Sequence, residues 1–106
     1  MSNFTDRERG FEAKYSFDLE QNFRIEAHLY KMLATWAGDK MGMSEAESRS
    51  YAAKIVGDVV SNPQENGIIS VLLADFGRHN IDMTVSEVNR KLEELRPLAR
   101  AELLEE

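Results

Sequence analysis

This chain of 106 residues has 19 aspartates and glutamates but only two histidines, and their spacing does not match a catalytic or metal-binding motif. The two histidines, His28 and His79, are far apart, and neither belongs to a HExxH pattern or has a carboxylate at ligand spacing. Adjacent carboxylates such as Glu93 and Glu94 do not face each other on a helix as a catalytic pair would. The chain has no cysteine, which excludes disulfides and thiolate chemistry. We therefore expect no enzymatic activity, no metal and no cofactor.

The glycines do not form a phosphate-binding loop, because they occur singly along the chain. Gly38 and Gly42 are expected only to weaken a helix near Lys40. Trp36 falls in an apolar stripe, so we expect it in the core rather than as a platform for a cofactor. A nucleotide pocket has no motif to support it, and weak nucleotide binding stays open as an alternative.

Composition favours a single globular domain, since 42% of the residues are hydrophobic and 30% are charged. The net charge of −6 argues against a nucleic-acid partner, which would require a basic face. No apolar run approaches the length of a membrane span, and the first residues do not resemble a secretory signal. These features predict a cytoplasmic protein that does not insert into the membrane.

Apolar residues recur every three or four positions from Phe23 onward, which is the period of amphipathic helices. The first stripe comprises Ile25, Leu29, Met32 and Trp36, with Leu33 beside them. Ser44 and Glu47 have the spacing of a capping box, which predicts the start of a second helix. Its stripe comprises Ala52, Ile55, Val56 and Val59. This helix should end near Asn62, because a residue before proline is displaced from the α region.

Residues 68–76 are compatible with a buried strand, but no other strand is available to pair with them. Their apolar residues share a helical face, formed by Ile69, Leu72, Leu73 and Phe76. We therefore predict a third helix here, for which Asn62, Pro63 and Glu65 are a candidate cap.

Thr84 and Glu87 repeat the capping-box spacing and predict the start of a fourth helix. The stripe that follows comprises Val85, Val88, Leu92, Leu95 and Ala99. Pro97 lacks a backbone donor, so we expect a kink or a restart at that residue. The predicted fold class is all-α, with residues 23–106 forming a small four-helix bundle.

The segment of residues 1–22 has a narrow aromatic stripe on an otherwise charged helix. Phe4, Phe11 and Tyr15 fall on one side, and Asp18 and Asn22 interrupt the same side before the core stripe begins. This polar break predicts a helical segment that can detach from the bundle and become disordered. The competing interpretation, that the segment is half of an ordinary bundle helix, stays open.

A set of short motifs extends over nearly the whole chain. The N-terminal motifs are Asp6-Arg7-Glu8, Phe11-Glu12-Ala13-Lys14-Tyr15, Asp18 and Phe23-Arg24. The later motifs are Lys31-Met32-Leu33 with Trp36-Ala37, then Tyr51-Ala52, Ala74-Asp75-Phe76 and Glu93-Glu94-Leu95. Together they resemble the alphaproteobacterial ATP synthase zeta subunit family, an inhibitor family. Gly10 departs from the family pattern, which has alanine or another good helix former at that position.

The resemblance implies an N-terminal inhibitory segment that becomes helical on binding. It would insert between the catalytic α and β subunits of the F-type ATP synthase head, against the rotor γ subunit, at the cytoplasmic face of the inner membrane. The implied partner-binding residues are Phe4, Asp6, Arg7, Glu8, Arg9, Phe11, Lys14, Tyr15 and Phe17. The alternative hypothesis is a small helical domain that binds a nucleotide or metabolite and does not inhibit an ATPase.

Overall fold

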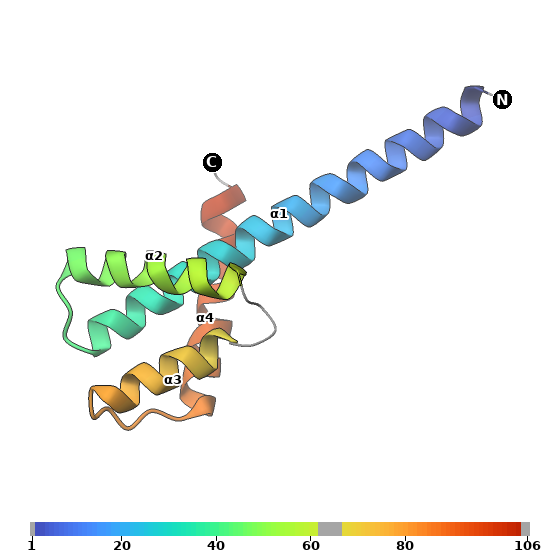
Figure 1. Ribbon diagram of the computed structural model, residues 1–106. Helices are drawn as coiled ribbons and strands as arrows, with labels where there is room; N and C mark the ends of the chain where they lie inside the picture. Colours follow the sequence, from blue (N-terminus) through green and yellow to red (C-terminus); the bar gives the residue numbers. More distant parts are fainter. Residues whose placement is uncertain (1, 62–66, 105–106) are drawn as a thin grey trace.

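The computed structural model describes the backbone of residues 2–61 and 67–104, and the side chains of residues 20–61 and 67–104. Figure 1 shows four α-helices: α1 (Ser2–Lys40), α2 (Glu45–Ser61), α3 (Ile68–Arg78) and α4 (Val85–Leu104). All regular secondary structure in the described residues is helical. The predicted all-α fold with four helices is therefore confirmed.

Helix α1 is the longest helix and contacts the other three. Its second half packs mainly against α2 and α4, while α3 contacts the other three helices more narrowly. At 1.5 Å per residue, its 39 residues span roughly 58 Å, which accounts for most of the longest dimension of 65 Å. The radius of gyration is 17.6 Å, against about 13 Å for a compact chain of this length. The first half of α1 therefore projects from the bundle, as Figure 1 shows.

The capping boxes predicted from the sequence position the starts of two helices. At the start of α2, the Ser44 amide donates to Glu47 Oε1 and the Glu47 amide donates to Ser44 Oγ, each at 3.2 Å. The bond from the Ser44 amide lowers the pKa of the Glu47 carboxyl. At the start of α4, the Glu87 amide donates to Thr84 Oγ1 at 3.1 Å. Side-chain oxygens thus satisfy amides that have no partner within the helix.

Two residues with left-handed backbone conformation end α1 and α3. Gly42 has a φ of 83° and Asn80 a φ of 58°. In each case the next amide donates back across the turn, to the carbonyl of Gly38 at 3.0 Å and to that of Phe76 at 2.9 Å. This is the Schellman arrangement, in which glycine and asparagine are the residues best tolerated.

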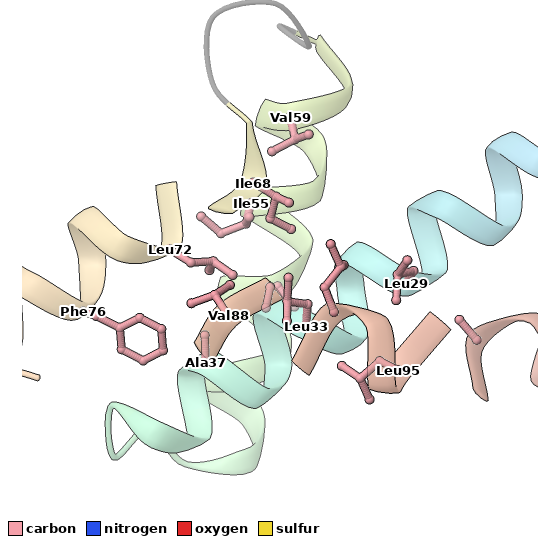
Figure 2. Close-up of a cluster of buried hydrophobic side chains, with 14 residues drawn as sticks. Leu29, Leu33, Ala37, Ile55, Val59, Ile68, Leu72, Phe76, Val88 and Leu95 are labelled. Atoms are coloured by element: carbon pink, nitrogen blue, oxygen red, sulfur yellow. The ribbon is translucent and has the colours of Figure 1, made fainter. Parts of the chain in front are cut away.

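The core lies where the second half of α1 meets the other three helices (Figure 2). Its buried members are Leu29, Leu33, Ala34, Ala37, Ala52, Ile55, Val59, Ile68, Leu72, Phe76, Val88, Leu92, Leu95 and Ala99. Burying side chains of this kind is the main favourable term in folding. The described residues contain no buried side-chain nitrogen or oxygen that lacks a hydrogen-bond partner.

Several predicted core residues are only partly buried. Met32 and Trp36 lie at the edge of the core, because α2 and α4 close over Leu29, Leu33 and Ala37 instead. The partly buried set also includes Val56, Ile69 and Leu73. Val85 is 54% exposed, since it is the first residue of α4 and precedes the first buried residue by almost a turn.

Pro97 does not interrupt α4, which is one helix from Val85 to Leu104. The predicted restart is therefore wrong, and the alternative of a kink at Pro97 stays a prediction. Pro97 is exposed, and so is Glu93, whose carbonyl loses its usual donor four residues later. Water can satisfy that carbonyl, which explains why the helix tolerates the proline. Between α2 and α3, the predicted stop at Asn62 and the candidate cap that follows lie outside the described residues.

Gly38 has a packing role that the sequence did not predict. It lies inside α1, where α2 crosses closely over it, and it is buried. A Cβ at this position would lie 2.8 Å from Ser48 Oγ and 3.2 Å from Ser48 Cα. The side chain of Ser48 is fully buried and donates to Asp39 Oδ1 at 3.1 Å. Gly38 therefore allows α1 and α2 to approach each other.

Substituting Gly38→Ala should lower the free energy of unfolding by about 1–3 kcal/mol, because the added methyl group must displace α2. Gly57→Ala is a matched control, since Gly57 also lies inside a helix but has no atom within 4 Å of the added Cβ. There the better helix propensity of alanine should raise the free energy of unfolding by roughly 0.5–1 kcal/mol. Urea unfolding measures both changes, and a Gly38→Ala variant as stable as wild type would contradict the close crossing.

Candidate functional site

The partner-binding residues predicted from the sequence all belong to the projecting half of α1. They are Phe4, Asp6, Arg7, Glu8, Arg9, Phe11, Lys14, Tyr15 and Phe17, and the backbone at each is helical. Their side chains lie outside the residues whose side chains the structure describes. The structure thus places these positions on one helix that extends from the bundle (Figure 1), and their assignment as contacts stays a prediction.

The helix leaves the bundle near Ile25, which is the first buried side chain among those described. Glu20, Asn22 and Arg24 are exposed, and Glu20 Oε1 pairs with Arg24 Nη2 at 2.8 Å along the helix surface. The backbone is helical through residues 18–22, so the polar break interrupts the apolar stripe without interrupting the helix. The division at residue 22 and the detachment of the segment before it stay predictions.

Phe23 is an exposed aromatic residue that the sequence analysis assigned to the start of the packed region. It is 58% exposed, whereas the other described aromatic residues are buried or partly buried. The signal that was missed is a series of four-residue steps through Phe11, Tyr15, Leu19 and Phe23. In a continuous helix such a series forms one ridge. Phe23 therefore lies at the bundle end of this sequence series, and within the series it is the member whose side chain the structure describes.

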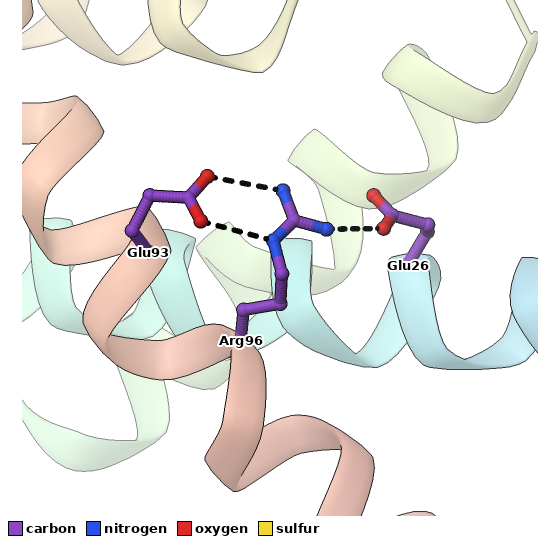
Figure 3. Close-up of polar contacts among 3 residues, drawn as sticks. All are labelled: Glu26, Glu93 and Arg96. Carbon is purple, nitrogen blue, oxygen red and sulfur yellow. Dashed lines mark hydrogen bonds and ion pairs between the residues drawn. The ribbon is translucent and has the colours of Figure 1, made fainter.

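Polar contacts join α1 to α4 at the point where α1 leaves the bundle (Figure 3). Arg96 Nη1 donates to Glu26 Oε1 at 2.6 Å, while Arg96 Nε and Nη2 lie 3.3 and 3.4 Å from the carboxylate oxygens of Glu93. Hydrogen bonding to Glu93 is the main cause of the raised pKa of Arg96, so the guanidinium stays charged. His28 Nε2 is 2.5 Å from Glu102 Oε2. Burial, followed by the nearby Glu26 carboxylate, raises the pKa of Tyr30.

An open groove of about 370 Å³ lies beside these contacts. Its lining includes His28, Lys31, Trp36, Asp39, Lys91 and Leu95. The Trp36 side chain packs against the core, with its ring centroid 5.9 Å from that of Phe76 in an edge-to-face arrangement. Lys91 Nζ lies 6.0 Å from the centroid of the Trp36 ring. Trp36 therefore contacts the edge of the core and also lines the groove.

A network of side-chain hydrogen bonds at the edge of the core joins α2 to α3. Tyr51 Oη donates to Asp75 Oδ2 at 2.5 Å, and Arg78 Nη1 donates to Asp75 Oδ1 at 2.6 Å. Burial is the largest cause of the raised pKa of Tyr51, with the Asp75 carboxylate adding to it. Two motifs that are separate in the sequence, one ending at Ala52 and one around Asp75, thus meet in the fold.

Within the part of the chain that the structure describes, no three histidine or carboxylate side chains come together in a way that could hold a metal ion. The histidines lie apart, and His79 Nδ1 is hydrogen bonded at the end of α3 to the carbonyl oxygen of Asp75 at 2.9 Å. None of the described helices is both long enough and apolar enough to cross a membrane.

A protein-family model described as ATPase inhibitor subunit zeta matches residues 1–102. The match includes the projecting half of α1, the contacts at its base and nearly all of the bundle. No curated protein matches the chain, and no solved structure matches it. Because the family model covers almost all of the 106 residues, the chain belongs to the ATPase inhibitor subunit zeta family.

Proposed function

We propose that this protein inhibits ATP hydrolysis by the F-type ATP synthase. Residues 1–22 insert as a helix between the catalytic α and β subunits of the head, against the rotor γ subunit, at the cytoplasmic face of the inner membrane. The observation that carries this proposal is the long helix α1, whose first half extends away from the bundle while its second half is the spine of the core. The family match supports an inhibitory role for the chain.

The projecting segment has the composition of a recognition helix. Phe4, Phe11 and Tyr15 are its proposed anchors, since burying a large apolar side chain contributes about 1.5–3 kcal/mol. The charged residues Asp6, Arg7, Glu8, Arg9 and Lys14 are proposed to surround them and to set the register of binding more than its strength. Phe17 completes the proposed contact set.

The bundle stabilises the binding segment through helix continuity. An isolated helix of about 20 residues is only marginally stable in water, because its first turn must form without tertiary support. In this chain the segment continues helix α1, whose later turns are held in the core. The segment can therefore extend an existing helix, and the partner does not have to nucleate a new one. The proposed mechanism is mechanical: the inserted helix blocks rotation in the hydrolysis direction, and the chain itself transforms no substrate.

Deleting residues 1–17 should abolish inhibition of ATP hydrolysis by the cognate head, because all nine proposed contacts are removed. The bundle should keep its fold, since the main core cluster of the described residues begins at Leu29 and the deleted part of α1 projects from the bundle (Figure 1). The measurement is an ATPase titration with the full-length and shortened proteins, with circular dichroism to verify the bundle. Leu98→Ser in the full-length chain is a control, because it removes an exposed apolar side chain of α4. Equal inhibition by the full-length and shortened proteins would contradict the proposal.

The groove beside Trp36 favours a second candidate function, the binding of a nucleotide by the bundle. Two lysines, Lys31 and Lys91, line it together with an aromatic ring, and its volume of about 370 Å³ lies at the lower end of small-molecule sites. Ammonium groups suit phosphates, and the Trp36 ring offers an apolar surface for a base. Asp39 opposes an anion in the same groove, so we expect weak affinity.

Titration with ADP should shift the NMR signals of the Trp36 indole and its neighbours more than those of residues 20–24. The double substitution Lys31→Gln/Lys91→Gln should reduce the affinity, whereas Lys54→Gln, an exposed lysine of α2, should not. Shifts confined to other parts of the bundle would contradict a site in this groove. Binding with no effect of the full-length protein on ATP hydrolysis would favour this candidate over inhibition.

A further inference from the structure

The ion pairs between helices are concentrated at the base of the projecting segment. Among the described residues, five of the seven ion pairs form within a single helix. The two that join different helices are Glu26 with Arg96, and His28 with Glu102, which is an ion pair when His28 is protonated and a hydrogen bond otherwise. Both link α1 to α4, and both occur on the turn of α1 that follows the exposed Phe23.

This turn lies where the packing of the core ends. The first member of the main cluster on α1 is Leu29, and Ile25 is buried but separate from that cluster. Glu26 and His28 therefore occupy the stretch between the core and the projecting segment. In this stretch, polar contacts with α4 supplement the hydrophobic packing that holds α1 further along.

These pairs are better suited to orient α1 than to stabilise the fold. The side chain of Arg96 is 41% exposed and that of Glu26 39% exposed, and exposed ion pairs contribute little to stability. The geometry of the Arg96 contacts is nevertheless directional, as Figure 3 shows. Two nitrogens of the planar guanidinium lie against Glu93 on the same helix, which leaves the third directed at Glu26.

The direction of α1 matters because, in a long helix, a small change of angle at the bundle moves the far end by a large distance. Position 4 is 22 residues before Glu26, or roughly 33 Å along the helix axis. A tilt of about 10° at Glu26 would therefore move that position by roughly 6 Å, which is about one helical turn. A displacement of this size would misalign side chains that must enter specific pockets.

We propose that Arg96 and Glu102 are positioning residues, which fix the direction in which α1 leaves the bundle through their hydrogen-bonded contacts with Glu26 and His28. The use of this direction in inhibition rests on the proposed function. The direction itself is a property of the free protein and can be measured without the partner.

The test variant is Arg96→Met/Glu102→Gln, which changes α4 only and leaves the sequence of α1 intact. Residual dipolar couplings of the amides of residues 20–24 report the orientation of this part of α1 relative to the bundle. In the wild-type protein these couplings should fit the alignment of the bundle. In the variant they should shrink and no longer fit, whereas Arg96→Lys, which keeps the charge, should retain part of the wild-type couplings.

Arg49→Met/Glu45→Gln is the matched control, because it removes an exposed ion pair of α2 with the same change of residue types. Its couplings should equal those of the wild type. Unchanged couplings in the α4 variant would overturn the proposal, and so would wild-type couplings of residues 20–24 that do not fit the bundle. Urea unfolding should show similar midpoints for both variants, which separates loss of direction from loss of the fold.

In the ATPase titration, the α4 variant should need a higher protein concentration than the wild type for half-inhibition. Each lost pair should raise that concentration by at most about five-fold, because an exposed pair contributes no more than about 1 kcal/mol. The α2 control should inhibit as the wild type does. Wild-type potency in the α4 variant would overturn the role of the pairs in inhibition. If the wild-type protein itself failed to inhibit, the proposed function would fail, while the dipolar couplings would still decide whether the pairs orient α1.

Discussion

The structure depends on the packing of one face of α1 into the bundle. Leu29, Leu33 and Ala37 follow one another at four-residue intervals and are fully buried by α2, α3 and α4. Gly38 extends this face and allows α2 to approach within contact distance of the α1 backbone. These residues occupy only the second half of a helix of 39 residues, and the first half of that helix projects from the bundle (Figure 1). The same helix thus holds the core together and carries the segment that we propose to bind the partner.

The types and order of the helices were predictable from local signals. The three-and-four spacing of apolar residues revealed each helix, and the Ser44 and Thr84 caps marked two of the starts. The phase of the α1 stripe was less predictable, because Met32 and Trp36 are apolar neighbours of the buried face. Whether the face of Leu33 and Ala37 or the neighbouring face of Met32 and Trp36 is covered depends on where α2 and α4 lie. The spacing of residues within α1 cannot specify that.

The contacts at the base of the projecting segment were not predictable from the sequence. Glu26 and Arg96 are 70 residues apart, and His28 and Glu102 are 74 apart. Such pairs depend on the crossing of α1 and α4, whereas capping boxes depend on residues three positions apart. Gly38 illustrates the same limit, since its role requires Ser48 of the next helix and its local propensity alone suggests only a weak helix. The predicted contact residues 4–17, in contrast, came from a local pattern together with a family resemblance.

The central claim is that the projecting segment and the bundle act as one continuous helix. Inserting two glycines between Gln21 and Asn22 tests it most directly, because the insertion leaves every proposed contact residue in place. It rotates the segment by roughly 200° relative to the bundle and weakens the helix at that point. The insertion variant should inhibit ATP hydrolysis far more weakly than the wild-type protein in the same titration. Inhibition equal to that of the wild type would contradict it.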